Sequence, residues 1–335
     1  MQWRTWRSVG VLAASLVTAG LVVAPGAAAA PAASCELWTG VPPPSPGASE
    51  NELDGMRALG PCNVWAVGFY QNVTNGQILS LAEHWNGTAW KVMSTPSPDS
   101  DRNVLSAVGA ATINDAWAVG QYFPSSTTNP LVLHWDGQQW TQTAAPHPGT
   151  DSVLEAVTAT SAKDVWAVGG YIASSGPKTL IEHWNGTKWS QVPSPNPAGP
   201  VGEIDLFGVA ATSASNAWAV GTYSTGTTDK TLIEHWNGHA WTLVPSPNPA
   251  PRNSLLAVAA TSAGNVWAVG TRTTSATEQT LIVRWNGTAW KPVPSPSPGQ
   301  VNELTSVATT SATDVWAAGF FTTGGVSQVL AAHCC

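Results

Sequence analysis

The stretch Asn265-Val266-Trp267-Ala268-Val269-Gly270 decides the fold of this chain, because it recurs along the whole sequence. Copies or close variants are centred on Trp65, Trp117, Trp166, Trp218, Trp267 and Trp316, with spacings of 52, 49, 52, 49 and 49 residues. Self-similarity at a fixed period of this size is typical of solenoids and propellers. We therefore interpret the chain as six copies of one structural unit.

Each unit is expected to form four strands, which in the fifth unit cover 255–261, 266–271, 280–285 and 290–293. A Ser-Ala-x-Asp/Asn turn separates the first two strands, and Asp or Asn there favours a tight turn. Asn-Gly or Asp-Gly separates the last two, as in a β-hairpin. Four strands in each of six units predict an all-β fold, a six-bladed β-propeller with four antiparallel strands per blade.

The two ends of the chain together make one hairpin. The sixth unit stops at Leu330-Ala331-Ala332-His333-Cys334-Cys335, before its fourth strand. The missing strand and tail are found near the N-terminus, as Cys35-Glu36-Leu37-Trp38 followed by Pro42 to Pro46. We therefore predict that the N-terminal strand closes the last blade, which would leave no bare sheet edge.

The aromatic strand ending in Gly, the following turn, the Trp and the Pro-containing tail resemble kelch-like repeats. A closer resemblance is to secreted bacterial repeat proteins that carry Trp-Asn-Gly-x-x-Trp and Pro-Ser-Pro-x-Pro. At the end of the repeated aromatic strand, the double glycine of the kelch family appears only as Gly169-Gly170. The resemblance covers all six units and implies a propeller used for binding, and it transfers no catalytic residue to this chain.

The first residues are typical of a signal peptide, with Arg4 and Arg7 before the apolar run 9–23 and small residues up to Ala33. We predict a signal peptide over 1–33 and a single propeller over 34–335. A retained anchor and a lipidated Cys35 are the alternatives. No second apolar run could span a bilayer, so we expect a secreted protein, extracellular or associated with the cell surface.

The charge balance restricts the partners. Only 10% of the residues are charged and the formal net charge is −7, which disfavours nucleic acid and anionic membranes. No nucleophile elbow, phosphate loop or metal motif is present, so we expect no catalytic residue, no metal and no cofactor. The partner we expect is an extracellular glycan or protein, bound by a monomer.

Four cysteines, Cys35, Cys62, Cys334 and Cys335, are predicted to cluster where the ring closes. In an oxidising compartment such residues form disulfides. We expect Cys35 to bond to Cys334 or Cys335, and Cys62 to bond to the other. A zinc site is the alternative, but no Cys-x-x-Cys spacing supports it.

Histidines and tryptophans recur in register, so we assign them to the scaffold. His84, His134, His183, His235 and His333 occupy equivalent places before the last hairpin, and Arg284 replaces the fifth of six. Equivalent positions on separate blades cannot converge on one metal ion. Positions that differ between units are better candidates for a ligand, because the scaffold needs the same residues in every unit.

Two groups of differing residues form the candidate site. The position two residues after the repeated Gly is occupied by Tyr70, Tyr122, Tyr171, Tyr223, Arg272 and Phe321, at the base of the variable loops. Asp54, Arg57 and Glu155 replace neutral or small residues of the first strands, at the mouth of the central channel. Capping of the core and an ion pair that plugs the channel are the alternative roles.

Three functions remain open at this point. The first is a binding or scaffold module that recognises a glycan or protein through the variable loop face. The second is a polysaccharide hydrolase or lyase with carboxylates at the channel mouth. The third is a structural surface protein without a specific ligand.

Overall fold

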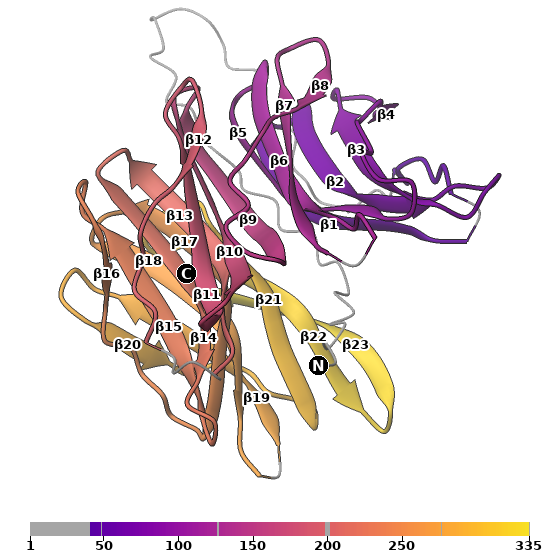
Figure 1. Ribbon diagram of the computed structural model, residues 1–335. Coiled ribbons are helices and arrows are strands. Elements are labelled where there is room, and N and C mark those ends of the chain that lie inside the picture. Colours follow the sequence, from indigo (N-terminus) through magenta and orange to yellow (C-terminus); the bar gives the residue numbers. More distant parts are fainter. Residues whose placement is uncertain (1–40, 48, 126, 198–201, 276, 335) are drawn as a thin grey trace, which may run out of the picture.

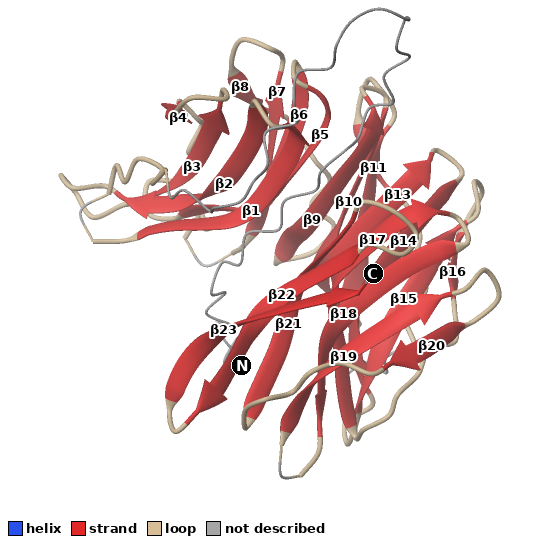
Figure 2. Cartoon of the chain, turned by 180° about the vertical axis from the view of Figure 1, so that it is seen from behind, coloured by secondary structure: helices blue, strands red, loops and turns tan. Residues whose placement is uncertain are grey.

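The computed structural model describes residues 41–334 apart from 48, 126, 198–201 and 276, and every regular element in it is a β-strand (Figure 1, Figure 2). The predicted signal peptide and the strand around Trp38 lie outside the described residues. Within the described part of the chain, no helix long and apolar enough to cross a membrane is found.

The strands follow the repeat, four to a unit until the last. Units one and two contain β1 (Asn51–Gly60), β2 (Asn63–Gln71), β3 (Ile78–Trp85), β4 (Trp90–Met93), β5 (Asn103–Thr112), β6 (Asp115–Tyr122), β7 (Asn129–Trp135) and β8 (Trp140–Gln142). Units three and four contain β9 (Ser152–Ser161), β10 (Asp164–Ala173), β11 (Gly176–Trp184), β12 (Trp189–Gln191), β13 (Ile204–Ser213), β14 (Asn216–Ser224), β15 (Asp229–Trp236) and β16 (Trp241–Leu243). Units five and six contain β17 (Arg252–Ser262), β18 (Asn265–Thr273), β19 (Glu278–Trp285), β20 (Trp290–Val293), β21 (Val301–Thr309), β22 (Val315–Thr323) and β23 (Val326–Cys334).

Within each unit the strands pair antiparallel in chain order, as predicted. A single parallel bridge, Asp229 to Arg252, links the fourth and fifth sheets into one hydrogen-bonded path. The first strands contact one another in the order β1, β5, β9, β13, β17 and β21, so they form the inner layer of the molecule. No contact of similar extent joins β21 to β1 among the described residues, and the sixth sheet has three strands there. Closure of the ring by the N-terminal strand therefore stays a prediction.

The repeated Gly of each unit is required by a close backbone approach. A Cβ atom built on Gly120 would lie 2.1 Å from the Val104 carbonyl oxygen, and one on Gly221 would lie 1.9 Å from the Asp205 carbonyl oxygen. At this level the register of the first strand shifts by one residue, for example between Leu206 and Gly208, which is a β-bulge. Glycine thus admits the bulge, and the bulge turns one side chain of each first strand out of the regular alternation.

The core lies between neighbouring sheets and is built on the repeated Trp. The Trp117 ring is 4.7 Å from the Trp184 ring and 5.2 Å from the Trp189 ring of the next unit, both distances being between centroids. Trp65, Trp166 and Trp218 enter the following unit in the same way, and all four are 1% exposed. We call this arrangement a Trp knob in a two-Trp slot.

The Pro-Ser-Pro-x-Pro tail is fixed to the third strand of its own unit. In unit three, the Thr179 and Ser194 hydroxyl oxygens are 2.6 Å apart, and the Thr179 amide donates to Asn196 Oδ1 at 2.9 Å. Equivalent hydroxyl pairs form in units one, four and five, namely Ser80–Thr95, Thr231–Ser246 and Thr280–Ser295. Unit two has Pro130 and Ala145 at the two positions instead. The two positions thus change together, from two hydroxyls to two apolar residues.

A double-mutant cycle should measure this coupling. Thr179→Val leaves the half-buried Ser194 hydroxyl without this partner, whereas Ser194→Ala leaves the buried Thr179 hydroxyl only its longer contacts to the Pro195 carbonyl and to Asn196 Oδ1. Each single change is expected to cost about 0.5–1.5 kcal/mol. The double variant copies the apolar chemistry of unit two and should cost less than the sum of the single changes. Urea denaturation of the three variants and the wild type gives the coupling energy, and strict additivity would show that the pair does not act as a unit.

Candidate functional site

The aromatic positions and the first-strand carboxylates lie at the same end of the molecule. In the first sheet, Asn51 pairs with Tyr70 and Glu52 pairs with Phe69, at the start of β1 and beside the β2–β3 loop. In the fourth sheet, Ile204 pairs with Tyr223 and Asp205 follows it. The inner strands therefore begin on the variable loop face, and the candidate site is the axial region at this end.

The predicted aromatic positions are equivalent in the structure, as the last or nearly last residues of β2, β6, β10, β14, β18 and β22. Their side chains are half-buried rather than free. Tyr122, Tyr171, Tyr223 and Phe321 pack against the apolar clusters between sheets, and the Tyr122 hydroxyl accepts a hydrogen bond from Asn129 Nδ2 at 3.1 Å. Core capping is therefore a real role of these residues, and ligand binding by them stays a prediction.

Two acidic residues of the candidate site, Asp54 and Glu155, lie in the β-bulges of their first strands. One residue of each first strand lies in the register shift, and these are Asp54, Ser106, Glu155, Phe207, Leu256 and Thr305. Bulges are over-represented beside active sites because they re-aim a side chain. Burial raises the pKa of Asp54 to about 8, with further contributions from Glu52 and Glu155. Burial also raises the pKa of Glu155.

A third acid, Asp205, belongs to the same group, and the sequence reasoning missed it. Burial raises its pKa to about 8, with the negative charges of Glu155 and Glu203 adding to the shift. Its carboxylate occupies space that only glycine leaves free, because a Cβ on Gly170 would lie 2.0 Å from Asp205 Oδ1. The signal in the sequence was Gly170 itself, since the equivalent residues in the other units are larger.

Arg57 is the basic residue of the predicted channel group. Its side chain is half-buried on β1, and Nε has no hydrogen-bond partner among the described residues. Burial lowers the pKa of its guanidinium. The ion pairs found in the described part of the chain do not include Arg57, Asp54 or Glu155. The alternative role, an ion pair that plugs the channel, therefore stays a prediction.

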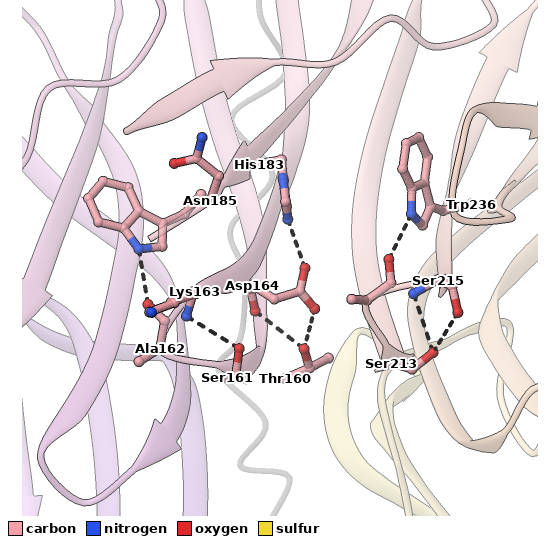
Figure 3. A network of polar contacts seen from close by, with 12 residues as sticks. Thr160, Ser161, Ala162, Lys163, Asp164, His183, Asn185, Ser213, Ser215 and Trp236 are labelled. Carbon is pink, nitrogen blue, oxygen red and sulfur yellow. Dashed lines mark hydrogen bonds and ion pairs between the residues drawn. The ribbon is translucent and has the colours of Figure 1, made fainter. Parts of the chain in front are cut away.

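The repeated histidines are part of the scaffold, as predicted. The His183 ring lies against the Trp166 ring, with centroids 4.2 Å apart and planes tilted by 30°. The Nε2 atom of His183 lies 2.7 Å from Asp164 Oδ1 (Figure 3). Asp164 also accepts a hydrogen bond from the Thr160 hydroxyl. In unit five Arg284 takes over both roles, by stacking on Trp267 and bonding to Asn265 Oδ1. No cluster of three potential metal ligands occurs among the described residues.

The structure separates the cysteines that it describes. Cys62 and Cys334 are both free and exposed. Cys62 packs on the hairpin of its own unit, because a Cβ on Gly87 would lie 2.8 Å from its sulfur. A bond between Cys62 and Cys334 is therefore absent. The predicted disulfide of Cys62, to Cys334 or to Cys335, is therefore wrong for this structure, as is a bond between Cys35 and Cys334. Cys35 and Cys335 themselves lie outside the described residues.

An asparagine at the start of three first strands forms hydrogen bonds to the preceding unit, and the sequence reasoning missed it. Asn302 is fully buried, and its Nδ2 donates to the Glu278 carbonyl of the preceding unit at 2.8 Å. Its Oδ1 accepts from the Gly299 amide of the preceding loop at 2.7 Å. Asn103 and Asn253 make the same contacts. The signal was an Asn two residues before the Leu of these first strands.

Comparison with known proteins shows the fold only. No protein-family model and no curated protein matches the chain. The structure is similar to YCF48 bound to a D1 peptide, with a TM-score of 0.51, 16% identity, and coverage of 87% of this chain and 84% of that one. It is also similar to the GH74 xyloglucanase from Xanthomonas campestris, with a TM-score of 0.57, 15% identity and 89% of this chain covered.

A third similar structure is a PL25 ulvan lyase, with a TM-score of 0.52, 10% identity, and coverage of 82% of this chain and 78% of that one. This chain spans only 45% of the xyloglucanase. These neighbours are β-propellers. The chain has a β-propeller fold, all-β and built from four-stranded antiparallel sheets.

Proposed function

We propose that the protein is a secreted six-bladed β-propeller, closed by its N-terminal strand, that binds an extracellular glycan or protein through its variable loop face. The main support is that the residues that differ between the six units lie together at one end of the molecule, on the variable loop face. Asp54, Glu155 and Asp205 lie there beside the aromatic positions, whereas the opposite hairpins repeat the same turn. Side chains that the scaffold does not need are the ones available for a ligand.

The structural neighbours are compatible with this proposal. YCF48 binds a peptide, according to its description, and the xyloglucanase and the ulvan lyase act on polysaccharides. A half-buried aromatic residue next to a carboxyl group suits a hydroxylated ligand, because the ring supplies apolar contact and the carboxyl group, protonated near neutral pH, can donate and accept hydrogen bonds.

Binding of the mature protein to glycan and cell-wall peptide arrays tests the proposal. Tyr171→Ala is expected to weaken binding at least tenfold, whereas Tyr171→Phe should retain most of it. His239→Ala, on an exposed hairpin of the opposite face, is the matched control and should bind like wild type. Equal losses for Tyr171→Ala and His239→Ala, or unchanged binding for both, would refute the assignment of the face.

A polysaccharide hydrolase or lyase is the second candidate, favoured by the raised pKa of Asp54, about 8. A carboxyl that keeps its proton near neutral pH is suited to act as a general acid. Asp54→Asn and Glu155→Gln should then abolish any turnover of a polysaccharide while leaving binding in place. Turnover that survives both changes would exclude these two residues as the catalytic groups.

A further inference from the structure

The last unit has an unpaired Trp knob and the first unit has an unfilled two-Trp slot, among the described residues. In four interfaces, a Trp knob from one unit lies in the two-Trp slot of the next, and the knob is 1% exposed. Trp316 of the last unit has the same stacking on its histidine, with centroids 4.1 Å apart, but it is 50% exposed. Trp316 is thus placed like the other Trp knobs, but no described pair of Trp rings surrounds it.

The first unit has the matching empty slot. The Trp85 and Trp90 centroids are 5.8 Å apart, close to the 6.1 Å between Trp184 and Trp189, which hold Trp117. No described residue places a third Trp between Trp85 and Trp90. Trp90 is only half-buried, whereas its counterparts Trp140, Trp189, Trp241 and Trp290 are buried.

A second pair of positions shows the same complementarity. Val329 on β23 pairs with Phe320, and this register makes it the counterpart of Thr179, which pairs with Gly170. In the tails, Val41-Pro42-Pro43-Pro44-Ser45-Pro46 aligns with Val192-Pro193-Ser194-Pro195-Asn196-Pro197, so Pro43 is the counterpart of Ser194. The hydroxyl pair of unit three thus corresponds to the apolar pair Val329 and Pro43, as it does to Pro130 and Ala145 in unit two. Val329 is 80% exposed on its own.

We infer that Trp316 packs between Trp85 and Trp90 of the same chain, and that Val329 is covered by Pro43. This assigns the face of β22 and β23 that carries Trp316, Phe320 and Val329 to the first sheet and the 41–46 tail as its partner. The inference rests on the closed ring proposed above and names the contacts that close it.

Tethering favours this partner over a second copy of the chain. Pro43, Pro44 and Ser45 already lie against the first sheet, where they line a cavity of about 290 Å³ with Asn51, Leu53 and Leu81. The tail continues directly into β1, so a contact between Pro43 and Val329 brings the first and last sheets together. A short tether gives an intramolecular contact a high effective concentration. The same knob and slot used between molecules would give an open head-to-tail array.

Hydroxyl-radical footprinting of the ligand-free mature protein tests the contact, with the oligomeric state measured by sedimentation velocity. Trp316 is expected to be as protected as Trp166 in a monomer. Trp316 labelled at the rate of an exposed side chain would overturn the inference. Protection found only in a head-to-tail oligomer would overturn the choice of partner. Because no ligand is present, this result is independent of whether the protein binds a glycan.

Two variants test the register. Val329→Thr alone places a hydroxyl opposite Pro43 and should increase labelling of Trp316 several-fold. Adding Pro43→Ser restores the hydroxyl pair of unit three and should return the labelling toward wild type. Ala145→Ser in unit two is the matched control, which should leave Trp316 unchanged. Failure of Pro43→Ser to rescue, together with an effect of Ala145→Ser, would show that the two ends are not paired as proposed.

Discussion

Replacing Glu182 or Glu234 with leucine is expected to raise the free energy of unfolding at pH 8 by about 1–3 kcal/mol for each change. Both carboxyls are fully buried, Glu182 on β11 and Glu234 on β15. Among the described residues, none of their four oxygen atoms has a hydrogen-bond partner. Leu133 occupies the equivalent register position in unit two, opposite an Ala and a Gln just as Glu182 is. The apolar residue thus fits the same interface.

Among the described residues, no ion pair involves Glu182 or Glu234. Leu180 and Trp184, on the same face of β11 as Glu182, pack on Trp117 of the preceding sheet. Burial alone raises the pKa of Glu182 and of Glu234 to about 8. Each group is therefore held in its neutral, protonated form in the folded protein near pH 7.

The sign of the pH dependence follows from this. In the unfolded chain a Glu titrates near its ordinary pKa of about 4.5, so between that pH and about 8 the folded state binds protons that the unfolded state does not. Stability is then highest below the unfolded pKa and falls as pH rises through this window, by at most about 1.4 kcal/mol per pH unit for each group. The leucine variants should flatten this slope and gain most at high pH.

Urea midpoints between pH 5 and pH 8.5 measure the effect. Glu182→Gln removes the titration without adding apolar surface, so it should flatten the slope with a smaller gain. Leu133→Glu is the reverse control in the same type of interface, and it should destabilise the protein increasingly with pH. A slope unchanged by Glu182→Leu and Glu234→Leu would show that these carboxyls are solvated or ionised in the folded state.

The second large effect is expected for Trp166→Ala, a loss of about 3–5 kcal/mol in the free energy of unfolding. The Trp166 ring is 1% exposed and lies 4.9 Å and 5.2 Å from the Trp236 and Trp241 rings, between centroids. Removing it would empty the slot between the third and fourth sheets and also unstack His183. Chemical denaturation measures the loss.

Trp166→Phe separates packing from hydrogen bonding. Within the described residues the indole Nε1 has only a weak contact with the Asp164 carboxylate and no partner in good hydrogen-bond geometry, so phenylalanine loses mainly ring area. Its cost should be well below that of alanine. Val73→Ala, at an exposed loop position, should be close to neutral. Similar costs for Trp166→Ala and Val73→Ala would contradict the role of the knob.

The sequence predicted the strands of each unit and their antiparallel order well, because these depend on local residue order. The strands of unit five were expected at 266–271 and 290–293, and the structure has β18 over Asn265–Thr273 and β20 over Trp290–Val293. The placing of the histidines in the scaffold was also confirmed. What the sequence did not predict was a side-chain neighbour from another unit, namely Asp205.

By itself, the sequence determined the number of units, the four-strand pattern and the equivalence of positions, since all of these follow from alternation and turn residues within about fifty residues. The tertiary structure decided which acids meet. Asp54, Glu155 and Asp205 come from three different units, and the charge of one raises the pKa of another only because the inner strands converge. It also decided that Glu182 and Glu234 are unpaired, because burial between two sheets depends on the neighbouring unit rather than on the strand that carries them.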